Sequence, residues 1–213
     1  MMLIVSFAQN SHAYLLVGVN SDYQFALNSN NPKGDPSGKR IGLYLSYGED
    51  AYFGSLKLYK GDINYTSGTN ASDDQTDLEI MAGYRIKPNI SAFLGYRQRS
   101  LDFSRSSQPI LEATEKLNHL GGGGAITFPI PNKLIVVADA KLYILTSSYN
   151  SDALENSATG YSIGTSVGLL RKLRKDIQAN LSGVVQMTNT EYETGGSYTD
   201  TMLGVSIGVS RLF

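Results

Sequence analysis

The chain has 213 residues, enough for one substantial domain, and its 18 lysine and arginine residues nearly balance its 19 aspartate and glutamate residues. This near-zero net charge excludes the electrostatic footprint of a nucleic-acid binder, and the absence of cysteine excludes disulfides, thiolate metal sites and a cysteine nucleophile. No run reaches the roughly 18 to 20 apolar residues of a spanning helix, so a helical membrane protein is excluded. Membrane-spanning strands stay open, since they show lipid only every second side chain.

The first residues, Met1–Ala13, combine an apolar start with small residues farther on. This segment resembles the tail of a secretory signal peptide with cleavage after Ala8 or Ala13, although it lacks a basic n-region and its apolar stretch is short. A disordered N-terminus is the alternative. We therefore divide the chain into a leader remnant or disordered segment at 1–13 and one domain at 14–213.

Apolar and polar side chains alternate from Leu15 onward, where Val17 and Val19 share one face and Gly18 and Asn20 share the other. Such period-2 alternation is typical of a strand with one apolar and one polar face. The pattern recurs along the chain, and its copies are close to the nine to eleven residues, roughly, that a tilted strand needs to cross a bilayer core. We predict about ten strands, at residues 15–27, 41–47, 52–58, 78–86, 90–96, 120–130, 134–144, 161–169, 177–187 and 203–213.

The connections between these strands alternate between short and long. Outer-membrane barrels place short turns on the periplasmic side and long loops outside. The sequence therefore predicts an all-β fold, a transmembrane antiparallel up-and-down β-barrel with an even strand number and both termini periplasmic. Short turns are expected at 48–51, 87–89, 131–132 and 172–176, and long loops at 28–39, 61–75, 102–117, 146–158 and 189–198.

One fragment of the third long loop has helical features. Pro109 stands where a first helical residue would, and Glu112 and Lys116 have i,i+4 spacing. We expect a short helix at 109–117. A plug folded into the barrel mouth and an ordinary surface turn are both open, and the surface turn is favoured.

The size of the polar-face residues indicates which face is the lumen. Soluble barrels also alternate, but with apolar residues inside. Small residues suit a narrow lumen better than a solvated exterior, so the apolar face is expected to point outward to lipid, with tyrosines 47, 52, 84, 96 and 161 near the interfaces. The small residues are Gly121, Gly123, Ala125, Ser162, Gly164, Ser166, Gly168, Gly204, Ser206, Gly208 and Ser210.

The last strand, TDTMLGVSIGVSRLF, resembles the terminal strand of Gram-negative outer-membrane β-barrels. Those proteins end in an aromatic residue preceded by alternating apolar positions, and the barrel-assembly machinery recognises this signal. Phe213, Val209, Ile207 and Val205 match the pattern, whereas Arg211 departs from it. The resemblance implies an outer-membrane location in a Gram-negative bacterium. It also implies the lipid bilayer, lipopolysaccharide and the assembly machinery as partners.

Charged residues on the polar face are candidates for a functional lumen. If the turn at 87–89 places Ile86 opposite Ile90, then Glu79 lies opposite Arg97 and Asp77 lies opposite Arg99. These charges form either the selectivity lining of a small pore or a salt-bridged core that closes the barrel, and the closed core is slightly favoured because small barrels are filled by their side chains. The inward charges are Lys57, Asp77, Glu79, Arg85, Arg97, Arg99, Asp139 and Lys141.

The sequence offers little for catalysis or metal binding. It has two histidines, His12 in the leader segment and His119 near the external end of a strand. A lone histidine lacks the orienting partners of a catalytic site, and the acidic loop residues lack an EF-hand spacing. We expect no enzyme, metal site or cofactor. The expected function is a structural or surface-interaction barrel acting through its external loops; a narrow channel is the alternative, and a hydrolase at the barrel rim is a less favoured one.

Overall fold

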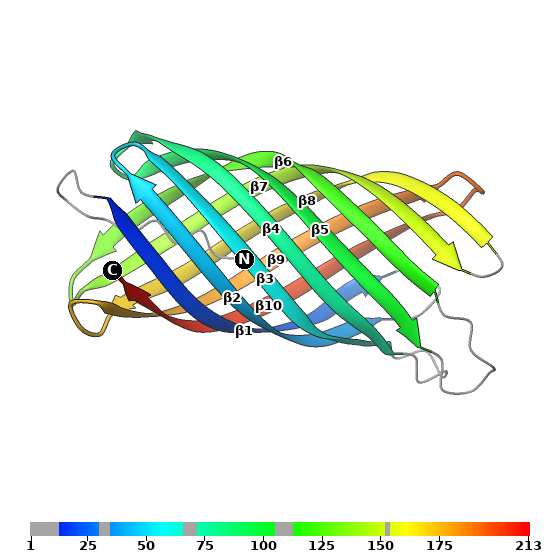
Figure 1. The fold of residues 1–213 in the computed structure, drawn as a ribbon, viewed down its shortest axis with the longest axis horizontal. Coiled ribbons are helices and arrows are strands. Elements are labelled where there is room, and N and C mark those ends of the chain that lie inside the picture. Colours follow the sequence, from blue (N-terminus) through cyan, green and yellow to red (C-terminus); the bar gives the residue numbers. More distant parts are fainter. Residues whose placement is uncertain (1–12, 30–34, 66–71, 105–112, 152–153) are drawn as a thin grey trace.

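The computed structural model describes residues 13–29, 35–65, 72–104, 113–151 and 154–213. Within them ten antiparallel strands form a closed barrel, in which each strand pairs with its sequence neighbours and β1 also pairs with β10 (Figure 1). This is the up-and-down topology that the sequence predicted. In the described segments, no helix is long and apolar enough to cross a membrane. The strands are β1 (Tyr14–Ser29), β2 (Pro36–Glu49), β3 (Tyr52–Tyr65), β4 (Ser72–Lys87), β5 (Ile90–Ser104), β6 (Ala113–Ile130), β7 (Leu134–Ser151), β8 (Leu154–Lys172), β9 (Ile177–Tyr192) and β10 (Ser197–Leu212).

The four short turns lie at the end of the barrel where β1 begins and the C-terminus lies (Figure 1). We call this the termini end and the opposite one the loop end. Asp50 and Asn132 have positive φ angles of 49° and 67° in two of these turns, a conformation that Asp and Asn adopt more readily than most residues. The turn between β4 and β5 differs in one detail from the prediction, because Lys87 rather than Ile86 lies opposite Ile90.

The strands are longer than the sequence predicted, running from 14 to 19 residues. Most of the loop expected at 146–158 is strand instead, because β7 continues to Ser151 and β8 begins at Leu154. The helix expected at 109–117 is wrong for 113–117, where β6 pairs with both β5 and β7 and its backbone groups find partners in the sheet. Residues 109–112, and residues 1–12 with the expected leader, lie outside the described residues.

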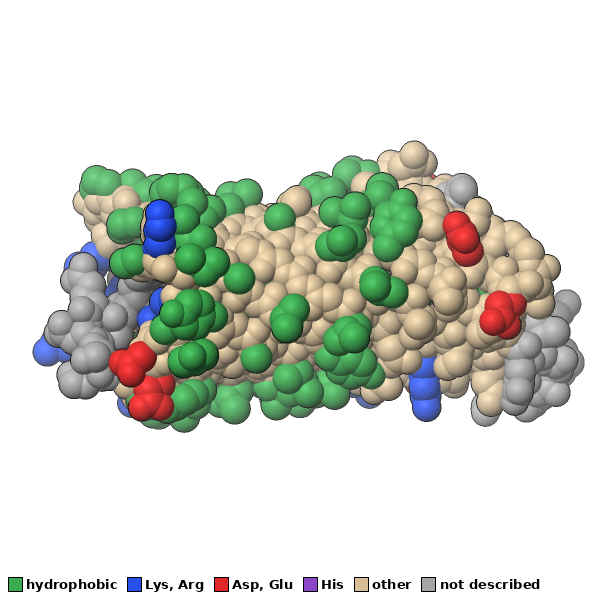
Figure 2. All heavy atoms as spheres, turned by 90° about the horizontal axis from the view of Figure 1, so that it is seen from above, with side chains coloured by type: hydrophobic (Ala, Val, Ile, Leu, Met, Phe, Trp, Pro, Cys, Tyr) green, Lys and Arg blue, Asp and Glu red, His purple; other side chains and the backbone are tan. Residues whose placement is uncertain are grey.

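Large apolar side chains cover the outside of the barrel, as predicted. Leu94 and Ile144 are 73% and 70% exposed, whereas Leu16 and Leu145 on the inner face are fully buried. Figure 2 shows hydrophobic side chains over the termini end and the middle of one face, and a mostly polar surface at the loop end. An apolar surface of this extent matches a lipid surrounding. The expected interfacial tyrosines, at positions 47, 52, 84, 96 and 161, are all exposed on this outer face.

The interior is layered along the barrel axis. Two buried apolar clusters lie toward the termini end and one lies toward the loop end, and a layer of buried charged residues around Asp77 lies between them. An apolar cluster therefore borders the charged layer on each side along the barrel axis. The clusters are Tyr14, Leu16, Tyr44, Val137 and Leu170; Phe53, Met81, Phe93 and Ala125; and Ile63, Leu101, Leu117 and Leu145.

Glycines on the inner face make room for aromatic rings of the neighbouring strand. A Cβ atom at Gly42 would lie 2.4 Å from ring atoms of Tyr59, which is directly opposite in the pairing of β2 with β3. The small inner residue therefore leaves room in the lumen for the larger side chain opposite it. The same arrangement occurs at Gly18 with Tyr44, Gly48 with Tyr14 and Gly83 with Phe53.

Candidate functional site

The structure places all eight predicted lumen charges on the inner face. Seven of them gather in the middle of the barrel, where β3, β4, β5 and β7 supply two carboxylates beside Asp77 and four bases. The eighth, Arg85, lies apart near the termini end, where it donates to the backbone oxygen of Asp50 over 2.9 Å and lies 5.9 Å from the Tyr14 ring. The seven are Lys57, Asp77, Glu79, Arg97, Arg99, Asp139 and Lys141.

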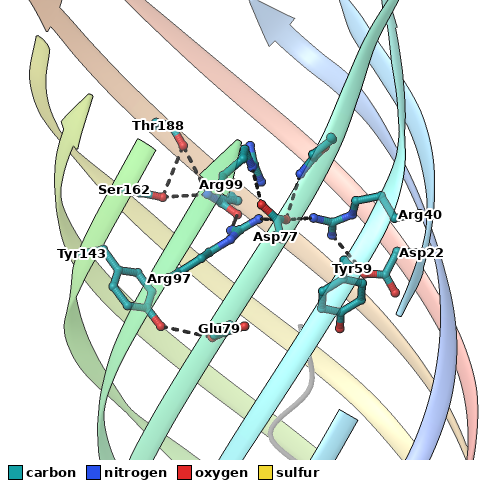
Figure 3. Close-up of polar contacts among 12 residues, drawn as sticks. Asp22, Arg40, Tyr59, Asp77, Glu79, Arg97, Arg99, Tyr143, Ser162 and Thr188 are labelled. Carbon is teal, nitrogen blue, oxygen red and sulfur yellow. Dashed lines mark hydrogen bonds and ion pairs between the residues drawn. The ribbon is translucent and has the colours of Figure 1, made fainter. Parts of the chain in front are cut away.

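Asp77 is the centre of this layer and is fully buried. Its carboxylate accepts from Arg97 Nη2 at 2.6 Å, from Arg99 Nε at 3.0 Å and from Arg40 Nη1 (Figure 3). Gln75 Nε2 adds a fourth hydrogen bond of 2.8 Å. A single carboxylate thus binds three guanidinium groups, which come from β2 and β5.

A second carboxylate balances part of this positive charge. Arg40 Nη2 binds Asp22 Oδ2 on β1 at 3.0 Å, and the Arg40 guanidinium lies 4.9 Å from the centre of the Tyr59 ring. Glu79 lies directly opposite Arg97 on β5 and opposite Lys57 on β3. Each of these buried charges therefore has a charge of the opposite sign beside it, and this attraction offsets the free-energy cost of removing the charges from water.

Hydrogen bonds cross the lumen at this level. The Tyr143 hydroxyl on β7 donates to Glu79 on β4 over 3.5 Å, and Arg97 on β5 donates to Gln186 on β9 over 3.4 Å. Gln186 in turn donates to Ser162 on β8 at 2.9 Å. The free space beside Asp77 amounts to about 20 Å³, close to the room that one water molecule occupies. Side chains therefore bridge and fill the barrel at its middle.

A larger cavity of about 240 Å³ lies above this layer, toward the loop end. Arg99, His119 and Gln186 line it next to the charged layer, Gln24 and Thr188 also contribute, and apolar, aromatic and acidic side chains line most of the rest. The latter are Ile63, Leu101, Leu117, Val184, Met202, Tyr65, Tyr192, Tyr198, Glu115 and Asp200.

His119 is placed inside the barrel near this cavity, as the sequence predicted. It is 2% exposed, lies directly opposite Arg97, and its ring makes an edge contact with Tyr143 at 6.2 Å. Among the residues that the structure describes, no carboxylate hydrogen-bonds to it, and no group of three or more His, Asp or Glu residues is arranged to hold a metal ion. His12 lies outside the described residues.

Several residues of this site were missed by reasoning on the sequence. Asp22 and Arg40 belong to β1 and β2, and the signal that could have found them is their place on the inner, polar face of the alternation. Tyr65, Tyr192 and Tyr198 fell in or beside segments expected as loops. They line the cavity because the strands continue to the loop end.

The C-terminal strand closes the barrel against β1. The backbone N–H of Phe213 donates to Leu15 at 2.8 Å, and the N–H of Leu15 donates back to Phe213 at 3.3 Å. Val205, Ile207 and Val209 of β10 point outward and are exposed. Arg211, the departure from the terminal pattern, binds Asp176 at 3.1 Å and lies over the Phe213 ring at 5.1 Å.

No family model and no curated protein matches the chain. Solved structures match its fold. The outer membrane protease OmpT from Escherichia coli matches with a TM-score of 0.63 at 9% identity, covering 99% of each chain. The translocator domain of the autotransporter NalP from Neisseria meningitidis matches with a TM-score of 0.55 at 14% identity, over 96% of this chain and 90% of that one. The β domain of the Bordetella autotransporter BrkA matches with a TM-score of 0.51 at 14% identity, over 94% and 99%. The chain therefore shares the closed antiparallel barrel fold of these outer-membrane proteins.

Proposed function

We propose that the chain is a closed outer-membrane barrel of a Gram-negative bacterium, with a structural or surface-interaction role carried by its loop end. The observation that carries the proposal is the filled lumen around Asp77. Three guanidinium groups, two neighbouring carboxylates and the cross-lumen bonds of Tyr143 and Gln186 leave about 20 Å³ there. A hydrated ion does not fit through that space, so recognition at the loop end is favoured over transport.

The outer surface supports the location. Its apolar side chains match a lipid bilayer, and the polar loop end matches a surface outside it. We propose lipopolysaccharide as the surrounding lipid of the outer leaflet. The terminal Phe213, with Val205, Ile207 and Val209, is proposed to be read by the barrel-assembly machinery during insertion.

The test is the conductance of the refolded protein in planar bilayers, with heat-modifiable gel migration as the check that it has folded. We expect the wild-type barrel to be silent. The channel alternative predicts reproducible current steps, and a double variant, Glu79→Gln with Arg97→Gln, would then change their ion selectivity. Such steps in the wild-type protein would overturn the proposal.

Hydrolysis at the rim is not proposed. The fold is shared with a protease, but the likeness concerns the fold alone. In the described part of the chain, no carboxylate hydrogen-bonds to His119 to orient its imidazole as a general base; its ring contacts Tyr143, and it is paired with Arg97 and Leu145.

A further inference from the structure

The cavity at the loop end has an acidic interior. Among the described residues, the inward-facing charged side chains on the loop side of Arg99 are all acidic: Glu115 and Asp200 line the cavity, and Asp73 is buried outside its lining. The lysines of this region, at positions 39, 60 and 116, are exposed on the outer face. Arg99 itself points its Nε at Asp77 in the charged layer below. A ligand in the cavity therefore meets an excess of negative charge.

Glu115 is the acidic residue with the most clearly defined surroundings. It is 4% exposed and accepts hydrogen bonds from Ser147 at 2.8 Å and from the Tyr192 hydroxyl at 3.3 Å. No ion pair reaches it from any described residue. Hydroxyl donors alone offset little of the cost of burying a carboxylate, whereas a cation beside it would offset more.

Aromatic rings stand next to this carboxylate. The rings of Tyr192 and Tyr198 lie 5.8 Å apart at an angle of 31°, and their hydroxyls are 3.5 Å apart. Tyr65 lines the same cavity. Faces of aromatic rings attract cations, and quaternary ammonium groups are commonly held in cages of such rings.

A second polar group of the cavity, His119, has a ring nitrogen without a hydrogen-bond partner among the described residues. This atom, Nδ1, is buried, and His119 lines the cavity wall. A neutral imidazole has one nitrogen that donates and one that accepts, so this atom is available to a ligand. Two separate groups, Glu115 and His119, thus face the same space.

We propose that this cavity binds a small organic cation, with its ammonium group at Glu115 and the rings of Tyr192 and Tyr198. The apolar part of the ligand packs on Ile63 and Leu117. The volume of about 240 Å³ is sufficient, because an apolar cavity of roughly 150 Å³ holds benzene. The inference rests on the proposed function in one respect, namely that the loop end is exposed outside the cell.

The test is isothermal titration of the full chain, refolded in detergent, with choline chloride and with its uncharged isostere 3,3-dimethylbutan-1-ol. We expect saturable binding of choline and at least about tenfold weaker binding of the isostere, since only the cation gains the electrostatic contacts. Glu115→Gln should weaken choline binding about tenfold. The matched control is Asp102→Asn, which removes an exposed outward-facing carboxylate from the neighbouring strand and should leave binding unchanged.

Tyr198→Leu is a second variant in case Glu115→Gln does not fold, and it should also weaken choline binding. Equal binding of choline and the isostere, or no binding of either, would overturn the inference. A parallel titration with N-acetyl-lysine amide distinguishes the source of the ammonium group: tight binding of that compound as well supports a lysine of a partner chain, and binding of choline alone supports a free small molecule. One outcome separates the two: the barrel conducts no current and is labelled at its loop end from outside the cell, yet binds neither choline nor N-acetyl-lysine amide. In that case only this inference is lost, and the proposed function stands.

Discussion

Arg40 on β2 binds Asp77 on β4 across β3, the strand that separates them. The contact is possible because the Tyr59 ring of β3 lies over Gly42, on the β2 side, and the guanidinium passes over the ring at 4.9 Å. Asp77 also binds Arg97 and Arg99. Its single carboxylate is therefore the shared counter-charge of three guanidinium groups from two strands.

Replacing Asp77 by Asn should strongly destabilise the barrel. The substitution keeps the shape of the side chain but leaves three buried guanidinium groups without their shared counter-charge, which typically costs about 3–5 kcal/mol. The measurement is equilibrium unfolding in urea of the barrel in lipid vesicles. Asp74→Asn, an exposed outward-facing neighbour on the same strand, is the control and should leave the midpoint unchanged. Equal midpoints for the two variants would show that the Asp77 network is not stabilising.

Leu16→Ala should create a cavity in the apolar cluster at the termini end. Leu16 is fully buried, and removing its side chain is expected to cost about 2–5 kcal/mol of unfolding free energy. Val17→Ala on the outer face should cost less, because the lipid can close around the shortened side chain. Thermal unfolding monitored by gel migration compares the two, and a larger loss for Val17→Ala would contradict the packing described.

Phe213→Ala should lower the amount of protein in the outer membrane without changing the stability of the refolded barrel. The Phe213 ring is 64% exposed and contacts Arg211, so the finished fold gains little from it, and the backbone bonds to Leu15 do not need the ring. Quantifying the folded band in isolated outer membranes, beside refolding of the purified variant, separates assembly from stability. Phe128→Ala removes another exposed aromatic ring and serves as the control; the same loss for both variants would argue against an assembly signal.

Single-cysteine variants should reveal the orientation, because the natural chain has no cysteine to remove. We expect a membrane-impermeant maleimide to label Glu193→Cys, in the turn between β9 and β10 at the loop end, on intact cells. Lys175→Cys, in the short turn between β8 and β9, should react only after the outer membrane is permeabilised. Both positions are exposed, so a reversed pattern would mean that the loop end faces the periplasm.

Much of the fold could be predicted because every second residue of a membrane-spanning strand faces lipid and is therefore apolar. The alternation predicted the number of strands, their order and the outward apolar face. It underestimated strand length because the alternation ends where the lipid ends: Thr188, Asn189 and Thr190 are polar on both faces, yet they continue β9 to the loop end. The apparent helix signal at 113–117 failed because pairing with two strands outweighs local spacing.

The candidate site was only partly predictable. The short turn between β4 and β5 sets Glu79 opposite Arg97 and Asp77 opposite Arg99, and the structure has both pairs in register. Asp77 and Arg99 form the expected ion pair, but the long Arg97 side chain reaches diagonally to Asp77. Arg40 could not be placed from local turns, since its contact with Asp77 joins strands that are not neighbours.

The pairs of glycine and aromatic residues help to determine the register between neighbouring strands. A shift of one residue between neighbouring strands turns apolar side chains inward and is opposed by the lipid, but a shift of two residues keeps every side chain on its proper face. Such a shift of β1 against β2 would bring Tyr44 opposite Leu16 or Asn20, where its ring would collide with another side chain, instead of opposite Gly18. The paired small and large residues thus carry information that hydrophobicity lacks, and they make the correct alignment distinguishable from its nearest competitors while the barrel is being assembled.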